Sequence, residues 1–261
     1  MVYNLIIMNN YTPFQSRVIP IFAYYIFISI FGAVVTIKMY LKWKERKVRP
    51  PLYLALVFTF LTLTVITLMI GLLEAIILRE YREIYRISLP LGYVMVVLAD
   101  IFLFIFASHM TNKGKKAYLP IALIGFIIAI MIFLPWNWWG VPQSDYVGKL
   151  NIRIYSTLIL VFYSYLIFIY IALIAKKIMK NVEDKIMYTG LKLLFYSMLS
   201  IMLLFMMLIG DTVLITFFEH EGYSEFIYIA WLFGVIFIIL SYLSLIMPDW
   251  LIKRINRKYN Q

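Results

Sequence analysis

Apolar residues do not alternate finely with polar ones along this chain; they form seven long runs separated by short polar segments. Runs of this length reach the ~18–20 residues needed to cross the hydrocarbon core of a bilayer. An open strand would leave its backbone groups unpaired in lipid, so these runs must form α-helices. The sequence predicts an all-α integral membrane bundle of seven transmembrane helices, at about 18–41, 52–78, 88–109, 117–134, 152–175, 187–217 and 225–247.

Composition agrees with this reading and limits what else the chain can hold. Of its 261 residues, 64% are hydrophobic and 14% are charged, whereas a soluble domain carries roughly a quarter charged residues. Seven spans leave no room for a separate catalytic or DNA-binding domain, so residues 1–261 are expected to form one domain. The chain has no cysteine, which excludes disulfides and thiol chemistry.

Lysine and arginine in the short loops predict the orientation, because cytoplasmic loops carry an excess of both. Sixteen lysine and arginine residues lie after the first, third, fifth and seventh spans, and six lie on the other side of the membrane. The N-terminus is therefore expected outside and the C-terminus in the cytoplasm, with the protein in the cell membrane. The net charge of +11 is explained by contact of the cytoplasmic face with anionic lipid headgroups, and we expect no nucleic-acid partner. The sixteen are Lys42, Lys44, Arg46, Lys47, Arg49, Lys113, Lys115, Lys116, Lys176, Lys177, Lys180, Lys185, Lys253, Arg254, Arg257 and Lys258.

Three carboxylates within the spans are the main candidates for function, since a charge there costs about 2.5–3.5 kcal/mol on insertion scales. Asp100 lies past the midplane of the third span, with Tyr93 one heptad earlier on the same face. Glu74 and Asp211 lie at similar depth in the outer half and are candidates to line one acidic pocket. The alternative is that all three bind helices together as packing groups. The predicted ligand-binding residues are Glu74, Tyr93, Asp100, Asp211 and Trp231.

Two further features allow more than one interpretation. The outer loop Pro135–Gly148 is rich in tryptophan, glycine and proline, which fits an interfacial anchor or a lid over an outward-facing pocket.

The first and last three spans run in the same direction around span four, and Ile70-Gly71 and Ile209-Gly210 lie at matching places in the two triplets. This spacing is consistent with a degenerate three-plus-one-plus-three repeat, and equally with chance.

The sequence also excludes several classes. Its two histidines, His109 and His220, lie on opposite sides of the membrane, so no zinc or haem site is expected. No phosphate-binding or dinucleotide motif is present, and no cofactor is predicted. The helix count and orientation resemble those of microbial rhodopsins and heptahelical receptors. However, span seven, Glu225–Met247, lacks the lysine that a retinal Schiff base needs, so the chain is not expected to be a retinal pigment.

The leading hypothesis is a receptor-like membrane sensor or signalling protein. It would bind a small cationic or amphipathic molecule in the outer half of the bundle and a partner protein at the cytoplasmic face. The alternative is a small-solute or ion-coupled transporter built on the repeat, with Asp100 near the midplane, where transport sites tend to lie. A structural membrane subunit is the third possibility. An intramembrane enzyme comes last, because no catalytic constellation is evident.

Overall fold

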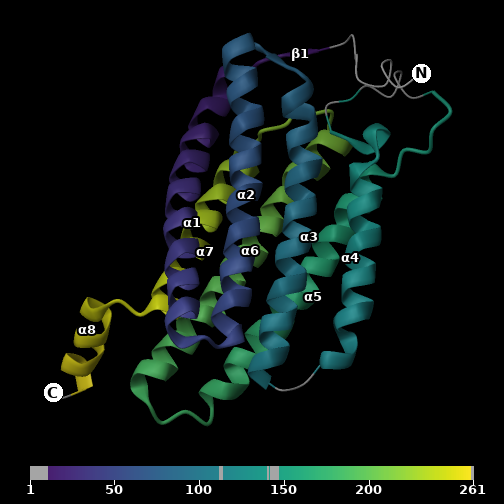
Figure 1. Ribbon diagram of the computed structural model, residues 1–261. Helices are drawn as coiled ribbons and strands as arrows, with labels where there is room; N and C mark the ends of the chain where they lie inside the picture. Colours follow the sequence, from purple (N-terminus) through teal and green to yellow (C-terminus); the bar gives the residue numbers. More distant parts are fainter. Residues whose placement is uncertain (1–10, 112–113, 140, 142–146, 260–261) are drawn as a thin grey trace.

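The computed structural model describes residues 11–111, 114–139, 141 and 147–259, which are almost entirely helical (Figure 1). Seven of the helices are long and apolar enough to cross a membrane, which confirms the predicted helix count and places each predicted span on its helix. They are α1 (Ile19–Arg46), α2 (Arg49–Leu78), α3 (Glu83–Thr111), α4 (Tyr118–Phe133), α5 (Arg153–Met179), α6 (Lys185–Phe217) and α7 (Glu225–Ile246). Short 3-10 turns cover Ser16–Val18, Lys115–Ala117 and Pro135–Asn137.

Six of the seven helices form a closed ring. The order around it is α1, α2, α3, α5, α6 and α7, with α7 returning to α1, while α4 packs outside against α3 and α5. Helix α4 accordingly buries little of its surface; its buried residues are Gly125, Ile128 and Ile132. The ring encloses the space in which a ligand site could form.

Packing within the first three helices is matched by packing within the last three. Helices α1–α2 and α2–α3 contact each other, as do α5–α6 and α6–α7, and the triplets join through α3–α5 and α7–α1. Helix α4 has no counterpart. This order of contacts is compatible with a three-plus-one-plus-three repeat, and it also arises in any ring whose helices follow chain order.

Small residues bring neighbouring helices close together, as expected where lipid provides no hydrophobic drive for association. A Cβ atom added at Gly71 of α2 would overlap the Ser88 side chain of α3. On the other side of the ring, Ser197 of α6 bonds Ser241 of α7 at 2.6 Å, and Ser200 donates to the Phe233 carbonyl at 2.9 Å. These contacts hold α2 against α3 and α6 against α7.

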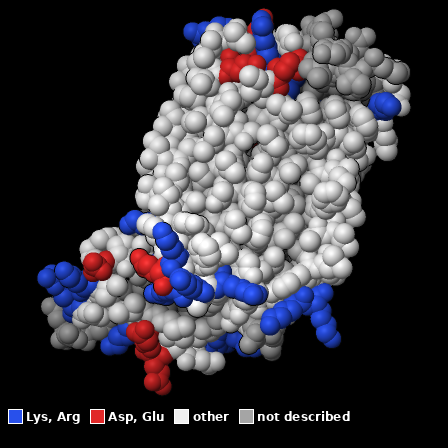
Figure 2. Space-filling view, viewed as in Figure 1, with Lys and Arg blue, Asp and Glu red and all other residues white. Residues whose placement is uncertain are grey.

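The two ends of the bundle differ in charge. Figure 2 shows a broad uncharged band, with lysine and arginine gathered at the C-terminal end and a smaller mixed group at the N-terminal end. At the N-terminal end two short strands, β1 (Thr12–Pro13) and β2 (Glu80–Tyr81), pair antiparallel with Thr12 opposite Tyr81. They lie outside the spans, where the prediction of an all-α chain missed them.

The tail after α7 forms a further helix, α8 (Asp249–Tyr259), that the sequence reading treated only as a basic tail. Pro248 separates α7 from α8, since proline is tolerated near a helix start but not in its interior. The helix carries Trp250 and Ile255 together with Lys253, Arg254 and Arg257. An apolar face beside a basic one is typical of a helix that lies at a membrane surface.

Candidate functional site

A large cavity opens inside the ring, in its N-terminal half. Its volume is about 810 Å³, within the ~300–1,000 Å³ typical of small-molecule sites. Along α6 it extends from Ile215 to Ile201, which corresponds to roughly 21 Å at 1.5 Å per residue. All six ring helices contribute to its wall, as do the N-terminal segment and the loops after α2, α4 and α6.

Aromatic side chains form much of the wall near the N-terminal end. Tyr25 meets Trp231 edge to face, with ring centroids 4.7 Å apart. Tyr81 lies against Tyr85 at 4.4 Å and stacks on Tyr223 at 6.3 Å, and the hydroxyls of Tyr85 and Tyr223 are hydrogen-bonded to each other. Burial raises the pKa of Tyr81 to about 12 and raises the pKa of Tyr223 above its ordinary value, so both of these loop tyrosines are neutral at physiological pH.

The N-terminal segment lies across the mouth of the cavity. Phe14 donates its backbone N–H to the Arg79 carbonyl at 2.9 Å, which continues the strand pairing. Gln15 Nε2 bonds Glu221 at 2.7 Å and Arg17 pairs with the same carboxylate at 3.3 Å. The segment thereby joins the α2–α3 loop to the α6–α7 loop, and Thr12, Pro13 and Gln15 line the cavity.

The structure places the five predicted site residues in different surroundings. Tyr93, Asp211 and Trp231 line the large cavity together. Glu74 and Asp100 are not among its lining residues, so the three carboxylates do not share one acidic pocket within the part of the chain that the structure describes.

Glu74 and Asp211 instead make the same kind of contact in the two helix triplets. Glu74 Oε2 accepts the backbone N–H of Tyr85 at the start of α3, at 2.9 Å. Asp211 Oδ1 accepts the backbone N–H of Ser224, at 2.9 Å, and its hydroxyl, at 2.6 Å, just before α7. A carboxylate near a helix N-terminus is stabilised by the free N–H groups and by the helix dipole. Both residues therefore hold the start of the following helix.

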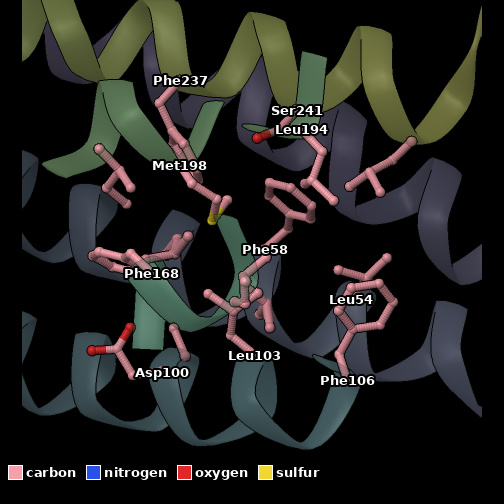
Figure 3. Close-up of a pocket in the computed structure, with 16 residues that line it drawn as sticks. Leu54, Phe58, Asp100, Leu103, Phe106, Phe168, Leu194, Met198, Phe237 and Ser241 are labelled. Atoms are coloured by element: carbon pink, nitrogen blue, oxygen red, sulfur yellow. The ribbon is translucent and has the colours of Figure 1, made fainter. Parts of the chain in front are cut away.

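Asp100 lies deeper in the bundle. It is 1% exposed and its Oδ2 accepts a hydrogen bond of 2.5 Å from the Ser164 hydroxyl of α5. Figure 3 shows it at the edge of a second, small cavity of about 20 Å³, which is enough for one water molecule.

An aromatic floor separates the two cavities. Phe58, Leu61, Ile201 and Phe237 line both of them. The rings of Phe58 and Phe237 lie 6.5 Å apart and nearly parallel. Asp100 lies on the far side of these residues and does not line the large cavity.

Sequence reasoning missed the most exceptional polar group of the large cavity, Arg153 at the start of α5. Its side chain lines the cavity beside Trp139, with the guanidinium carbon 5.2 Å from the centre of the indole ring. Trp139 belongs to the outer loop for which anchor and lid were both considered; part of that loop, including 142–146, lies outside the described residues. The sequence did contain a signal for this residue. Arg153 is a basic residue at the start of a span, on the side of the membrane where lysine and arginine are few.

Buried Asn137 fixes the position of this part of the site. Its Nδ2 donates to the Met131 carbonyl at 2.9 Å, and its Oδ1 accepts the Ile152 backbone N–H at 3.0 Å. The end of α4 is thereby tied to the residue that precedes Arg153. Among the described residues, no group of three or more histidine, aspartate and glutamate side chains is arranged to hold a metal ion.

No protein family, no curated protein and no solved structure matches this chain.

Proposed function

We propose that this protein is a heptahelical, receptor-like membrane sensor that binds a small amphipathic molecule in its large cavity. The observation that carries the proposal is the cavity itself, which has the size of a ligand site and is walled by all six ring helices. Because every ring helix contacts the ligand volume, a bound molecule can change how the helices pack against one another. Tyr93, Asp211 and Trp231 are the proposed contacts retained from the predicted set.

In the proposed orientation the cavity faces the exterior and the basic end lies in the cytoplasm. The charge distribution supports this, since lysine and arginine gather at the C-terminal end (Figure 2). There α8 and the loops would contact anionic lipid headgroups and a partner protein. A ligand outside and a partner inside is the arrangement that a signalling protein needs.

The transporter alternative has one observation in its favour, the matched packing of the two helix triplets. Against it stands the floor of Phe58, Leu61, Ile201 and Phe237, beyond which the small cavity near Asp100 has a volume of about 20 Å³. A transported solute would need that floor to open. We therefore favour the receptor reading.

Filling the cavity tests the proposal. Leu208→Trp on α6 would put an indole ring into the cavity, whereas Leu203→Trp would put the same ring on the perimeter, where Leu203 is 38% exposed and does not line the cavity. Binding of radiolabelled dodecanol to protein in lipid nanodiscs is the readout. We expect saturable binding by wild type and Leu203→Trp and its loss in Leu208→Trp; equal binding by all three would refute a ligand site here.

A further inference from the structure

Arg153 places a cation in the wall of the large cavity. Its Nη2 donates to the Val141 carbonyl at 3.1 Å, but its buried Nε has no hydrogen-bond partner. No carboxylate among the described residues lies within ion-pair distance of it. A guanidinium presents five N–H donors that match the oxygens of a carboxylate or phosphate.

The local backbone makes this position still more favourable for an anion. Arg153 is the first residue of α5, a helix of 27 residues. The N-terminus of a helix carries a partial positive charge and favours acidic groups, so an arginine there is unfavourable for the helix. The helix end and the guanidinium both favour negative charge near the start of α5, where the Arg153 backbone N–H already donates to Asn151 Oδ1 at 3.0 Å.

The negative groups of the cavity wall cannot supply that charge, because they are engaged elsewhere. Asp211 accepts two hydrogen bonds from Ser224, and Glu221 bonds Gln15 and Arg17. Among the described residues, the cavity wall therefore holds no free carboxylate for Arg153, and the anionic group of a ligand would fill that role.

The surroundings of Arg153 indicate what carries the anion. It opens a membrane span beside Trp139, at the level where lipid headgroups lie. From there the cavity continues inward past Thr157, Leu160 and Val161 to the aromatic floor, so an apolar chain could follow the charged group. Leu158 lines the cavity and is also 42% exposed at the perimeter. At α5 the cavity therefore borders the perimeter of the bundle at Leu158.

We infer that the ligand of the large cavity is a single-chain amphipathic anion, with its carboxylate on Arg153 and its alkyl chain directed toward Phe58 and Phe237. This inference rests on the proposed function and adds the charge of the ligand and the residue that selects it. A hydrogen-bonded charge pair of this kind strengthens binding by roughly ten- to a hundredfold over an uncharged analogue.

The test compares dodecanoate with dodecanol, which share one chain and differ in the charged group. Radiolabelled forms of both are bound to wild type, Arg153→Gln, Arg153→Lys and the control Lys149→Gln, a cation near Arg153 that does not line the cavity. We expect wild type and Lys149→Gln to prefer dodecanoate at least tenfold. Arg153→Gln should lose the preference while still binding dodecanol, and Arg153→Lys should keep part of it.

The outcomes separate this inference from the proposed function. If dodecanol binding is lost in Leu208→Trp, but dodecanoate is not preferred or is preferred equally by Arg153→Gln, the cavity is a ligand site and the assignment of an anion to Arg153 is wrong. If neither compound binds saturably, or Leu208→Trp leaves both unchanged, the proposed function falls and the inference falls with it. Retained dodecanol binding by Arg153→Gln also serves as proof that this variant is folded.

Discussion

Gly71 is the position where adding a single methyl group should most disturb the helix packing that positions the cavity wall. A Cβ atom there would overlap the Ser88 hydroxyl and lie 2.7 Å from Ser88 Cβ and 3.0 Å from Tyr85 Cα. The serine hydroxyl can rotate away, but Ser88 Cβ and the Tyr85 backbone can only move if α3 shifts away from α2. The Gly71→Ala substitution therefore also displaces Tyr85, whose ring lines the cavity.

The expected change in the free energy of unfolding of Gly71→Ala follows from two opposing effects. Forcing a methyl group into a closely packed contact costs about 1–3 kcal/mol, and three short contacts place Gly71→Ala near the upper figure. Replacing a helical glycine with alanine returns about 1 kcal/mol. The net expectation is a destabilisation of about 2 kcal/mol, which for a chain of this size lowers the melting temperature by roughly 4 °C or more.

Gly92 of α3 provides a matched control at the same helix pair. Its added Cβ would come no closer than 3.4 Å to a neighbour, the Thr64 methyl group, which is an ordinary contact. Gly92→Ala should leave the melting temperature unchanged or raise it. The assay is fluorescence-detection size-exclusion chromatography of heated, detergent-solubilised protein. The reasoning is refuted if the two variants melt alike, or if adding Ser88→Ala, which removes only the hydroxyl, fully restores Gly71→Ala.

Two further predictions concern single interactions. The buried pair of Asp100 and Ser164 should show a coupling free energy of about 0.6 kcal/mol, and at most about 1.7 kcal/mol, in a double-mutant cycle with Asp100→Asn and Ser164→Ala; a coupling of zero would show that the hydrogen bond is absent. Because burial raises the pKa of Tyr81 to about 12 from its ordinary value of 10, the folded state favours the neutral phenol. The resulting stabilisation is complete below pH 10 and is lost as the pH rises from 10 to 12. Tyr81→Phe should therefore lose less stability than wild type between pH 10 and 11 in thermal melts, and an identical loss would contradict the burial of this hydroxyl.

The sequence predicted the helices well because membrane spans obey a strong rule. Every backbone group in lipid must be paired within a helix, so run length alone located all seven elements. The amphipathic helix α8 escaped notice because Asp249–Tyr259 is too short and too charged for that rule. The strand pair at Thr12–Pro13 depends on a contact with Glu80–Tyr81, which lies far away in the chain.

The site was harder to predict, because the sequence marks unusual residues but not which way they face. Intramembrane carboxylates were the evident candidates, yet Glu74 proves to hold the start of α3 and lies outside the cavity wall. Arg153 received no special weight, because an arginine at a span boundary is common. Only the fold reveals that its guanidinium lines a cavity and that no carboxylate among the described residues lies within ion-pair distance of it.

The central claim is that the cavity is reached from the outer side and ends at the aromatic floor. The absence of cysteine allows single-cysteine variants to be labelled in sealed cells with a membrane-impermeant thiol reagent. Thr212→Cys and Thr62→Cys place the thiol in the cavity wall, Val213→Cys places it on the 39%-exposed perimeter beside Thr212, and Ser164→Cys places it below the floor, next to Asp100.

The account predicts labelling of the two cavity variants from outside, with Val213→Cys and Ser164→Cys unreactive until the membrane protein is denatured. Unreactive Thr212→Cys and Thr62→Cys would contradict an outward-facing ligand cavity. Labelling of Ser164→Cys in the native protein would mean that the floor opens, as the transporter reading requires.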